Sequence, residues 1–321
     1  MPRPVVFVAR RIPEVALQLI AEHADVRLHA GVLPPTRAEL FDGVKGCAGV
    51  LSLLSDRMDA EVFDAAGSQL KVVSNFAVGF NNIDVPEARR RGIAVGNTPG
   101  VLTEATADIA VALLLAAARR LPEGWQAVKE LEWKTWEPLG WMGLDLAGKT
   151  LGIVGLGRIG SAVAQRLHGG WRMKVLYTAR SAKPEFDQKF GARHVPLDEL
   201  LRESDFISLH VPLTIETRKL IGMPEFALMK RNAILINTAR GEVLDQVALH
   251  EALSSHRIFA AGLDVCEPEP LPSDSPLREL ANCLIVPHIG SATIAARDAM
   301  ADRSARNLIA GVLEHPLPYA V

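Results

Sequence analysis

The stretch Thr150-Leu-Gly-Ile-Val-Gly-Leu-Gly-Arg-Ile-Gly-Ser161 decides the fold class. An apolar run typical of a buried strand leads into glycines at 155, 157 and 160, and a helical pattern of apolar residues follows at once. Gly155 allows a tight turn, Gly157 lets the backbone approach a pyrophosphate, and Gly160 lets the new helix pack on the strand. The helix N-terminus presents free N–H groups to the phosphates. This order of strand, glycines and helix predicts a dinucleotide-binding turn.

The next strand-like run, residues 173–178, ends about 20 residues after the turn, where an NAD enzyme carries the acid that binds the ribose. The sequence there reads Tyr177-Thr-Ala-Arg-Ser181, without Asp or Glu, and Lys183 lies just beyond. A carboxylate repels a 2′-phosphate, whereas the guanidinium of Arg180 can bind one through two parallel hydrogen bonds. Such charged bonds contribute about 1.5–3 kcal/mol, a preference of roughly 10- to 150-fold. We therefore expect NADP(H) as the preferred coenzyme, with NAD(H) as the alternative if Arg180 is merely a solvated residue.

The composition describes a globular chain of 321 residues, which is long enough for two domains. A formal net charge of −2 and a pI near 6.5 argue against bulk attraction to nucleic acid or to an anionic membrane. Cys47, Cys266 and Cys283 have neither zinc nor disulfide spacing, which suits a reducing cytoplasm. The longest apolar segment, residues 109–118, is too short to span a bilayer, and the N-terminus has no secretory pattern. We expect a cytoplasmic protein without a metal site that binds neither nucleic acid nor membrane.

Strand-like runs alternate with helical patterns along the chain, which predicts parallel α/β structure. A first series has four such runs, pauses at a turn over residues 96–100, and is followed by a long apolar helix over residues 102–120. A second series begins at Thr150 and has six runs, enough for one complete doubly wound nucleotide domain. The expected strands lie at residues 5–9, 26–30, 47–51 and 70–74 in the first series and at 151–154, 173–178, 206–210, 233–237, 260–263 and 284–286 in the second.

A last long helix, residues 292–313, would return to the first series, so we expect the first domain to be discontinuous. We predict two Rossmann-like, doubly wound parallel-sheet domains joined by two long hinge helices. Residues 1–101 and 290–321 would form a flavodoxin-like substrate-binding domain, because the first series has no glycine fingerprint of its own. Residues 102–289 would form the dinucleotide-binding Rossmann domain, with a dimerisation arm at about residues 121–149.

Three ionisable residues follow strands of the second series, where functional groups collect in open α/β sheets. Arg240, Glu269 and His288 come after the third-last, second-last and last of these strands. An arginine can bind a substrate carboxylate, a histidine can supply a proton, and a carboxylate bound to that histidine favours its charged form. Taken singly, each has an ordinary alternative: Arg240 could form a structural salt bridge, Glu269 could be a solvated acid, and His288 could be a core histidine with satisfied hydrogen bonds. Their joint position favours a hydride-transfer site.

Several motifs together resemble the D-2-hydroxyacid dehydrogenases over nearly the whole chain. They are the glycine turn at 155–160, Asn237-Thr-Ala-Arg-Gly241, Gly262-Leu-Asp-Val265 and Pro287-His-Ile-Gly-Ser-Ala-Thr293. Within that family the chain most resembles the glyoxylate/hydroxypyruvate reductases. The narrower likeness is carried by Leu53-Leu-Ser-Asp56, Tyr177-Thr-Ala-Arg180 and Trp136-Glu-Pro-Leu-Gly-Trp141.

The resemblance implies roles for the substrate site. Arg240, Glu269 and His288 match the catalytic arginine, the acid and the proton-donating histidine of the family. Residues 75–84 match its substrate-carboxylate loop, whose backbone N–H groups at Val78 and Gly79 would bind the anion. Leu53 would line the pocket. Trp141 would close the pocket from the neighbouring subunit of a homodimer; the alternative is an ordinary aromatic anchor in the arm.

The resemblance also implies the coenzyme contacts. The expected coenzyme-binding residues are Thr106, Gly155, Gly157, Arg158, Ile159, Gly160, Ala179, Arg180, Ser181, His210, Val211, Pro212, Thr238, Ala239, Asp264, His288 and Gly290. The sequence departs from the broad family pattern at the missing ribose acid, which agrees with NADP(H), and at Cys266, where an aromatic residue is common.

The function expected from these residues and from the resemblance is NADPH-dependent reduction of small 2-oxoacids, glyoxylate to glycolate and hydroxypyruvate to D-glycerate. One alternative is a related dehydrogenase for another acid. A second alternative, from a different class, is a dinucleotide-sensing binding protein similar to the corepressors that share this fold.

Overall fold

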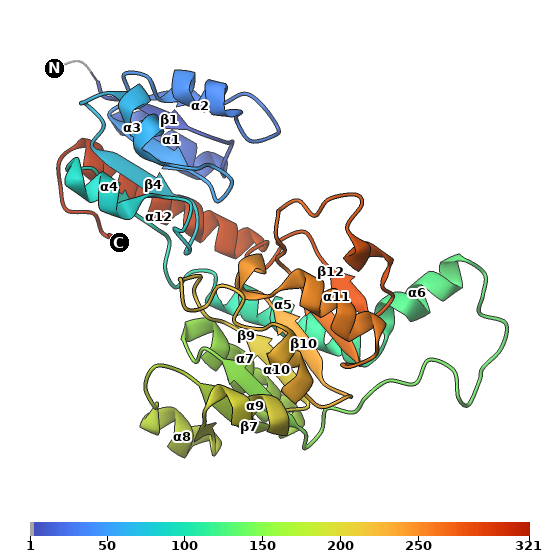
Figure 1. Cartoon of the computed structure of the whole chain (residues 1–321). Coiled ribbons are helices and arrows are strands. Elements are labelled where there is room, and N and C mark those ends of the chain that lie inside the picture. The colour runs from blue at the N-terminus through green and yellow to red at the C-terminus, as the bar shows by residue number, and fades with distance from the viewer. Residues whose placement is uncertain (1–2) are drawn as a thin grey trace. The chain divides into compact units, whose positions relative to one another are not determined.

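A computed structural model describes residues 3–321. The chain forms two compact units. The first unit contains the chain up to Leu102 together with Ala292–Val321, and the second unit is Thr103–Ser291. Each unit is built on its own parallel sheet with helices packed against it (Figure 1).

The first unit has a five-stranded sheet in the order β2-β1-β3-β4-β5. Its strands are β1 Val5–Val8, β2 Asp25–Leu28, β3 Gly49–Ser52, β4 Val72–Asn75 and β5 Ala94–Gly96. Its helices are α1 Glu14–His23, α2 Arg37–Val44, α3 Ala60–Ala66, α4 Val85–Arg90 and α12 Ile294–Val312. All strand pairs are parallel, and the central strands β3 and β4 are fully buried, as expected for a sheet covered on both faces.

The second unit has a seven-stranded sheet in the order β12-β11-β10-β9-β6-β7-β8. Its strands are β6 Thr150–Val154, β7 Lys174–Thr178, β8 Arg193–His194, β9 Phe206–Leu209, β10 Ile234–Asn237, β11 Ala260–Leu263 and β12 Cys283–Ile285. The order of strands reverses between β6 and β9. Ligands of doubly wound sheets bind at such a switch point, outside the carboxyl ends of the strands.

Helices cover both faces of this second sheet. The helices of the second unit are α5 Thr103–Ala118, α6 Leu121–Lys129, α7 Arg158–Trp171, α8 Pro184–Phe190, α9 Leu197–Glu203, α10 Met223–Leu228 and α11 Gln246–Ser254, with short 3₁₀ turns at Gly241–Val243 and Pro276–Glu279. One apolar core joins α5 and α7 to the sheet, and another joins α9, α10 and α11 to it. The carboxyl ends of the strands are thereby held on a rigid support.

Helix α6 and the loop that follows it extend away from the seven-stranded sheet (Figure 1). This arm carries large apolar side chains in water. Among them are Trp125, Val128, Leu131, Trp133, Trp136, Leu139 and Met142, each more than half exposed. An apolar surface of this extent is typical of an interaction site.

The predicted fold class, two doubly wound parallel-sheet domains, is confirmed. Two strands escaped prediction. The turn predicted to begin at Gly96 is wrong at that residue, because Gly96 ends β5 and forms an antiparallel bridge to Ala320. The second sheet has seven strands, whereas six were predicted. The additional strand is β8, a two-residue edge strand whose side chains are polar and exposed. Strand β8 carries no apolar run, and the apolar run at β5, Ile93-Ala-Val95, is shorter than the runs of four to eight residues by which a strand is recognised in sequence.

The predicted long helices are present with shorter ends. Helix α5 stops at Ala118, since Arg120 has φ +52 and turns the chain into α6. Helix α12 begins at Ile294 because the hydroxyl of Thr293 accepts the N–H of Ala296 and caps it. That these helices act as hinges stays a prediction.

Candidate active site

The glycine turn joins β6 to α7 in the second unit, as predicted. Gly155 has φ +98, and a Cβ atom there would lie 2.8 Å from the carbonyl carbon of His210. A side chain is excluded at Gly155 by both its backbone conformation and this close neighbour. A Cβ on Gly160 would collide with the carbonyl oxygen of Gly155, so α7 packs directly against the turn.

The turn fits a dinucleotide phosphate. A Cβ on Gly157 would meet no protein atom within 4 Å, so the backbone there is open to a ligand. Gly157 occupies the N-cap of α7 without a side-chain cap, and the N–H groups at the helix start are available to an anion. Arg158, exposed, and Ile159 are the first residues of this helix.

Polar atoms without partners lie on the strands beside the turn. His210 Nδ1, after β9, and Thr238 Oγ1, after β10, are buried and have no hydrogen-bond partner within residues 3–321. Burial lowers the pKa of His210 to about 3, so its imidazole is neutral, and Nε2 lies 2.8 Å from the Ser208 hydroxyl. Buried polar atoms normally have partners, so the two orphaned atoms fit a site for a polar ligand.

The end of β7 carries no carboxylate. Thr178 ends the strand, Ala179 and Ser181 flank the exposed Arg180, and the first acids come later, in α8. In the described chain the Arg180 guanidinium has neither an ion pair nor a hydrogen bond to protein. The Tyr177 hydroxyl accepts the N–H of Lys183 at 2.6 Å and so shapes the loop that presents Arg180.

His288 and Glu269 form a direct pair. His288 Nδ1 lies 2.7 Å from Glu269 Oε2, with side chains 29% and 37% exposed. Burial would raise the pKa of the Glu269 carboxyl. The hydrogen bond and charge of His288, the Cys266 N–H and the charge of Arg240 outweigh burial and lower this pKa below its ordinary value. The carboxylate is therefore ionised at neutral pH, facing the imidazole.

Asp264 fixes the loop that carries His288. His288 has φ +51, a conformation that non-glycine residues seldom adopt. The buried Asp264 carboxylate accepts the N–H of Ile289 at 2.6 Å and of Gly290 at 2.8 Å. Burial raises the pKa of Asp264 despite these hydrogen bonds and the charge of His288, which oppose it. A Cβ on Gly290 would meet both Asp264 and Thr106, so these three expected coenzyme contacts do lie together.

Arg240 completes this group electrostatically. It follows β10, and the turn before it is held by Asn237, whose side chain accepts the N–H of Ala239 and donates to the carbonyl of Arg240. Burial lowers the pKa of Arg240, while the negative charges of Glu269 and Glu242 oppose that shift. The guanidinium stays charged at neutral pH, because arginine side chains are not deprotonated in proteins. The positive charges of His288 and Arg240 thus both act on the Glu269 carboxylate.

The expected carboxylate loop belongs to the first unit. Leu53 follows β3, and Val78 and Gly79 follow β4. Within residues 3–321 the N–H groups of Val78 and Gly79 have no hydrogen-bond partner in the protein. The loop is held by Asn75 and Asn82, whose side-chain amides were not predicted as functional. The signal was available, because Asn75 is the last residue of a buried strand.

Other expected contacts have local partners. The Val211 side chain lies against Gly155, and the Pro212 carbonyl accepts the Thr217 hydroxyl at 2.6 Å. Trp141 lies in the arm, 44% exposed, with the Arg120 guanidinium 5.8 Å from its ring centre.

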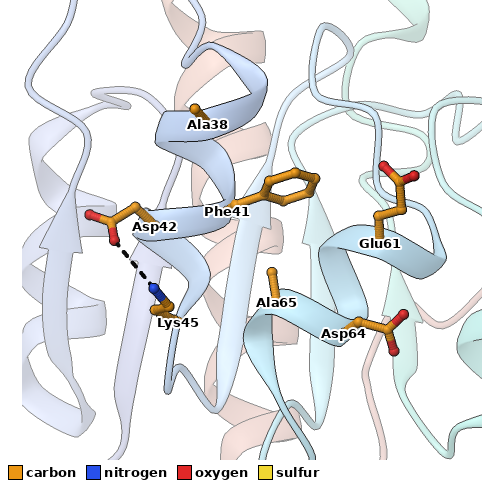
Figure 2. Close-up of a pocket in the computed structure, with 7 residues that line it drawn as sticks. All are labelled: Ala38, Phe41, Asp42, Lys45, Glu61, Asp64 and Ala65. Atoms are coloured by element: carbon orange, nitrogen blue, oxygen red, sulfur yellow. Dashed lines mark ion pairs between the residues drawn. The ribbon is translucent and has the colours of Figure 1, made fainter.

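A separate groove lies between α2 and α3 in the first unit (Figure 2). It has a volume of about 610 Å³ and is lined by Ala38, Phe41, Asp42, Lys45, Glu61, Asp64 and Ala65. None of these is a predicted site residue. They lie on helices that cover one face of the sheet, whereas every strand-end group described above lies at a sheet edge.

The described residues contain neither a metal-binding cluster nor a membrane-spanning helix. Residues 3–321 hold no cluster of three or more His, Cys, Asp and Glu side chains arranged to bind a metal ion. No helix in that part of the chain combines the length and hydropathy needed to cross a membrane.

The family model described as D-isomer specific 2-hydroxyacid dehydrogenase, NAD binding domain, matches residues 111–290. The chain belongs to the D-2-hydroxyacid dehydrogenase family. It is 51% identical over 309 residues to a glyoxylate reductase of Korarchaeum cryptofilum, covering 96% of this chain and 92% of that one. Membership makes it an NAD(P)-dependent oxidoreductase that reduces 2-oxoacids with a nicotinamide dinucleotide.

Solved structures agree with this placement. A Thermus thermophilus protein of known structure is 47% identical and superposes with a TM-score of 0.92, covering 99% of both chains. An NADPH-dependent glyoxylate/hydroxypyruvate reductase of Sinorhizobium meliloti, solved with NADP and malonate, is 31% identical. Its TM-score is 0.84, with 100% of this chain and 97% of that one covered.

Proposed function

We propose that this D-2-hydroxyacid dehydrogenase reduces glyoxylate to glycolate and hydroxypyruvate to D-glycerate with NADPH, and that His288 is the proton donor. The observation that carries the proposal is the 2.7 Å contact between His288 Nδ1 and Glu269 Oε2. Because Nδ1 is engaged by the carboxylate, Nε2 is the ring atom left to face a substrate. The names of the Korarchaeum and Sinorhizobium relatives support these substrates.

The proton step follows from this pair. The bound reduced nicotinamide supplies the hydride that the keto carbon receives. As the carbon–oxygen double bond becomes single, its electron pair moves onto the oxygen, which takes the Nε2 proton of the His288 imidazolium and becomes the hydroxyl. Glu269 favours the charged imidazole beforehand, since an opposite charge within hydrogen-bond distance stabilises it. His288 is left neutral and is recharged by a proton from water.

The substrate carboxylate is bound by the N–H groups of Val78 and Gly79 and by the guanidinium of Arg240. Guanidinium and backbone N–H groups are strong partners of a carboxylate. Leu53 lines the pocket, and Trp141 of a second subunit limits it to small acids. The half-buried, charged Arg240 supports this role, because a cation partly withdrawn from water favours an anionic ligand.

The coenzyme lies along the seven-stranded sheet in this proposal. Its phosphates meet the N–H groups at the start of α7, with Gly155, Gly157 and Gly160 making room. Its 2′-phosphate meets Arg180. The absence of a carboxylate at the end of β7 and the unpaired Arg180 guanidinium within the described residues support NADPH over NADH.

We further propose a cytoplasmic homodimer formed through the arm. The exposed apolar side chains of α6 and the following loop support this assembly, since water disfavours such a surface on a monomer. Light scattering should give twice the chain mass. The variant Leu131→Asp with Trp136→Asp should give the chain mass, and an unchanged mass would argue against the arm as the interface.

The decisive experiment is a steady-state panel that follows absorbance at 340 nm. Glyoxylate, hydroxypyruvate, pyruvate and 3-phosphohydroxypyruvate are each supplied with NADPH and with NADH. The proposal expects the highest kcat/KM for the first two acids with NADPH. A maximum with 3-phosphohydroxypyruvate would point to another acid substrate, and tight coenzyme binding without turnover would point to a sensor.

A further inference from the structure

We propose that Asn97 is a positioning residue that turns two consecutive backbone N–H groups, those of Val78 and Gly79, toward the substrate carboxylate. The inference rests on the proposed function, which gives these N–H groups the task of binding the anion. It assigns the orientation of that binding site to a side-chain amide outside the loop itself.

Two carbonyl groups of the loop are held by the segment after β5. The Ala77 carbonyl accepts the backbone N–H of Thr98 at 2.9 Å, and the Val78 carbonyl accepts Nδ2 of Asn97 at 2.7 Å. In a trans peptide the C=O and the N–H of the next residue point in opposite directions. Both carbonyls face the segment after β5, so the N–H groups of Val78 and Gly79 both face away from it.

The result is a pair of adjacent donors on one side of the loop. Consecutive N–H groups that point the same way form a concave binding site for an anion. Neither N–H is taken by another group within residues 3–321. If the peptide between Val78 and Gly79 turned over, its carbonyl oxygen would face the anion in place of the N–H. Asn97 opposes that rotation because its amide would lose its acceptor.

The next carbonyl of the loop, that of Gly79, is held by Asn75. Asn75, fully buried, donates Nδ2 to the Gly79 carbonyl at 2.8 Å and to Asn82 Oδ1 at 3.1 Å, while its Oδ1 accepts the Ser52 hydroxyl at 3.0 Å. Asn82 in turn donates to the Leu53 carbonyl at 2.9 Å. The loop and the predicted pocket residue Leu53 are therefore fixed by one amide network.

Asn97 is itself fixed by the C-terminal part of the first unit. Its carbonyl accepts Nδ2 of Asn307, in α12, at 3.0 Å, and its N–H donates to the Tyr319 carbonyl at 3.1 Å. The buried Asn307 also accepts the Tyr319 N–H at 3.0 Å. With its backbone held at both groups, Asn97 can direct its side chain at one carbonyl, and a preorganised donor pair costs no rearrangement when the anion binds.

The test compares Asn97→Leu, which keeps the side-chain size without the donor, with Asn97→Ser, which keeps a shorter donor. Asn282→Leu is the matched control, since its amide donates to the carbonyls of Leu253 and Phe259 in the second unit. Each variant is measured for glyoxylate KM and kcat, for inhibition by oxalate, for NADPH Kd by fluorescence, and for Tm.

We expect Asn97→Leu to raise both the glyoxylate KM and the oxalate inhibition constant about tenfold or more, with NADPH Kd unchanged and Asn97→Ser intermediate. A lost charged hydrogen bond accounts for a change of that size. Asn282→Leu should shift Tm without raising KM. If Asn97→Leu fails to fold, Asn97→Ser decides by the same constants.

Unchanged KM and oxalate constants in an active Asn97→Leu enzyme would overturn the inference and leave the proposed function standing. An equal fall in kcat and NADPH affinity with constant KM would also overturn it, as the effect would then be structural. If the wild type neither reduces glyoxylate nor binds oxalate, the proposed function fails, and the inference with it.

Discussion

The two sheets hold their proposed functional groups in different ways. At the edge of the seven-stranded sheet the groups are charged, and Glu269, His288 and Arg240 act on one another through opposite charges. At the edge of the five-stranded sheet the loop is held by the neutral amides of Asn75 and Asn97.

The difference corresponds to two chemical tasks. A proton donor has to change its charge during each turnover, so it needs titratable neighbours. A site that only binds an anion has to keep its shape at every working pH, which neutral amides provide. Asp56 is the buried carboxyl at the margin of the amide network, and burial raises its pKa against the opposing hydrogen bonds from Leu53 and Ser55. Because its functional groups titrate, the edge of the seven-stranded sheet should respond to pH. The loop held by neutral amides should not.

Removal of the His288 imidazole from the charged sheet edge should have the largest effect. His288→Ala should lower kcat by about 10²- to 10⁴-fold, the usual contribution of a general acid. NADPH Kd should stay nearly the same, because the glycine turn that would bind the phosphates is untouched. His250→Ala, on α11, is the control. A variant with normal kcat would place the proton donor elsewhere.

Two glycines of the turn in the second unit should have different effects, one on stability and the other on coenzyme binding. Gly155→Ala should destabilise the protein by about 1–3 kcal/mol from backbone strain alone, because φ is +98 there. Gly157→Ala should leave Tm unchanged, since its Cβ meets no protein atom, and should still weaken NADPH binding. Thermal melts and coenzyme titrations of both variants check this. Equal loss of Tm in the two variants would contradict it.

A smaller effect is expected from the coenzyme arginine. Arg180→Asp should reduce the NADPH-over-NADH ratio of kcat/KM by about tenfold, near the lower end for a charged hydrogen bond, because the residue is exposed. Arg202→Asp on α9 is the matched charge change away from the turn. If both variants keep the wild-type ratio, another group binds the 2′-phosphate.

Much of this molecule could be predicted because its signals are local. The glycine turn after β6 and the apolar runs of the buried strands follow from residue type and spacing alone. Strands β5 and β8 were missed because they are short and depend on pairing with neighbours far along the chain. Pairing is a property of the folded sheet, which a local pattern does not contain.

The site shows the same limit. The 2.7 Å pairing of His288 with Glu269 was anticipated from strand ends and family resemblance. Asp264 as a coenzyme contact stays a prediction, and the hydrogen bonds from the backbone of Ile289 and Gly290 to its carboxylate were not predicted. The task of Asn97 was missed, because its partner Val78 lies 19 positions away, and an asparagine after a strand has many common uses.

The sharpest test of the comparison is the pH profile, where the expected shift is small. The lowered pKa of Glu269 keeps its carboxylate charged at neutral and mildly acidic pH. In Glu269→Gln the imidazolium loses this opposite charge, so kcat should begin to fall at a lower pH as pH rises. Half-exposed pairs are weak, so the shift should stay under about one pH unit. Asn97→Leu should raise KM with an unmoved pH profile.

The same pair sets the sign of a stability effect. A carboxyl whose pKa is lowered by folding stabilises the protein at pH values above its ordinary pKa of about 4.3. This contribution is lost as the pH falls through the lowered pKa. The difference in Tm between wild type and Glu269→Gln should therefore be present at pH 7 and shrink in acid, whereas that between wild type and Asn97→Leu should stay constant over the same range. A pH-dependent Asn97→Leu difference would mean that the amide loop is coupled to a titrating group, with Asp56 the nearest buried candidate, and the division between the two sheets would no longer hold.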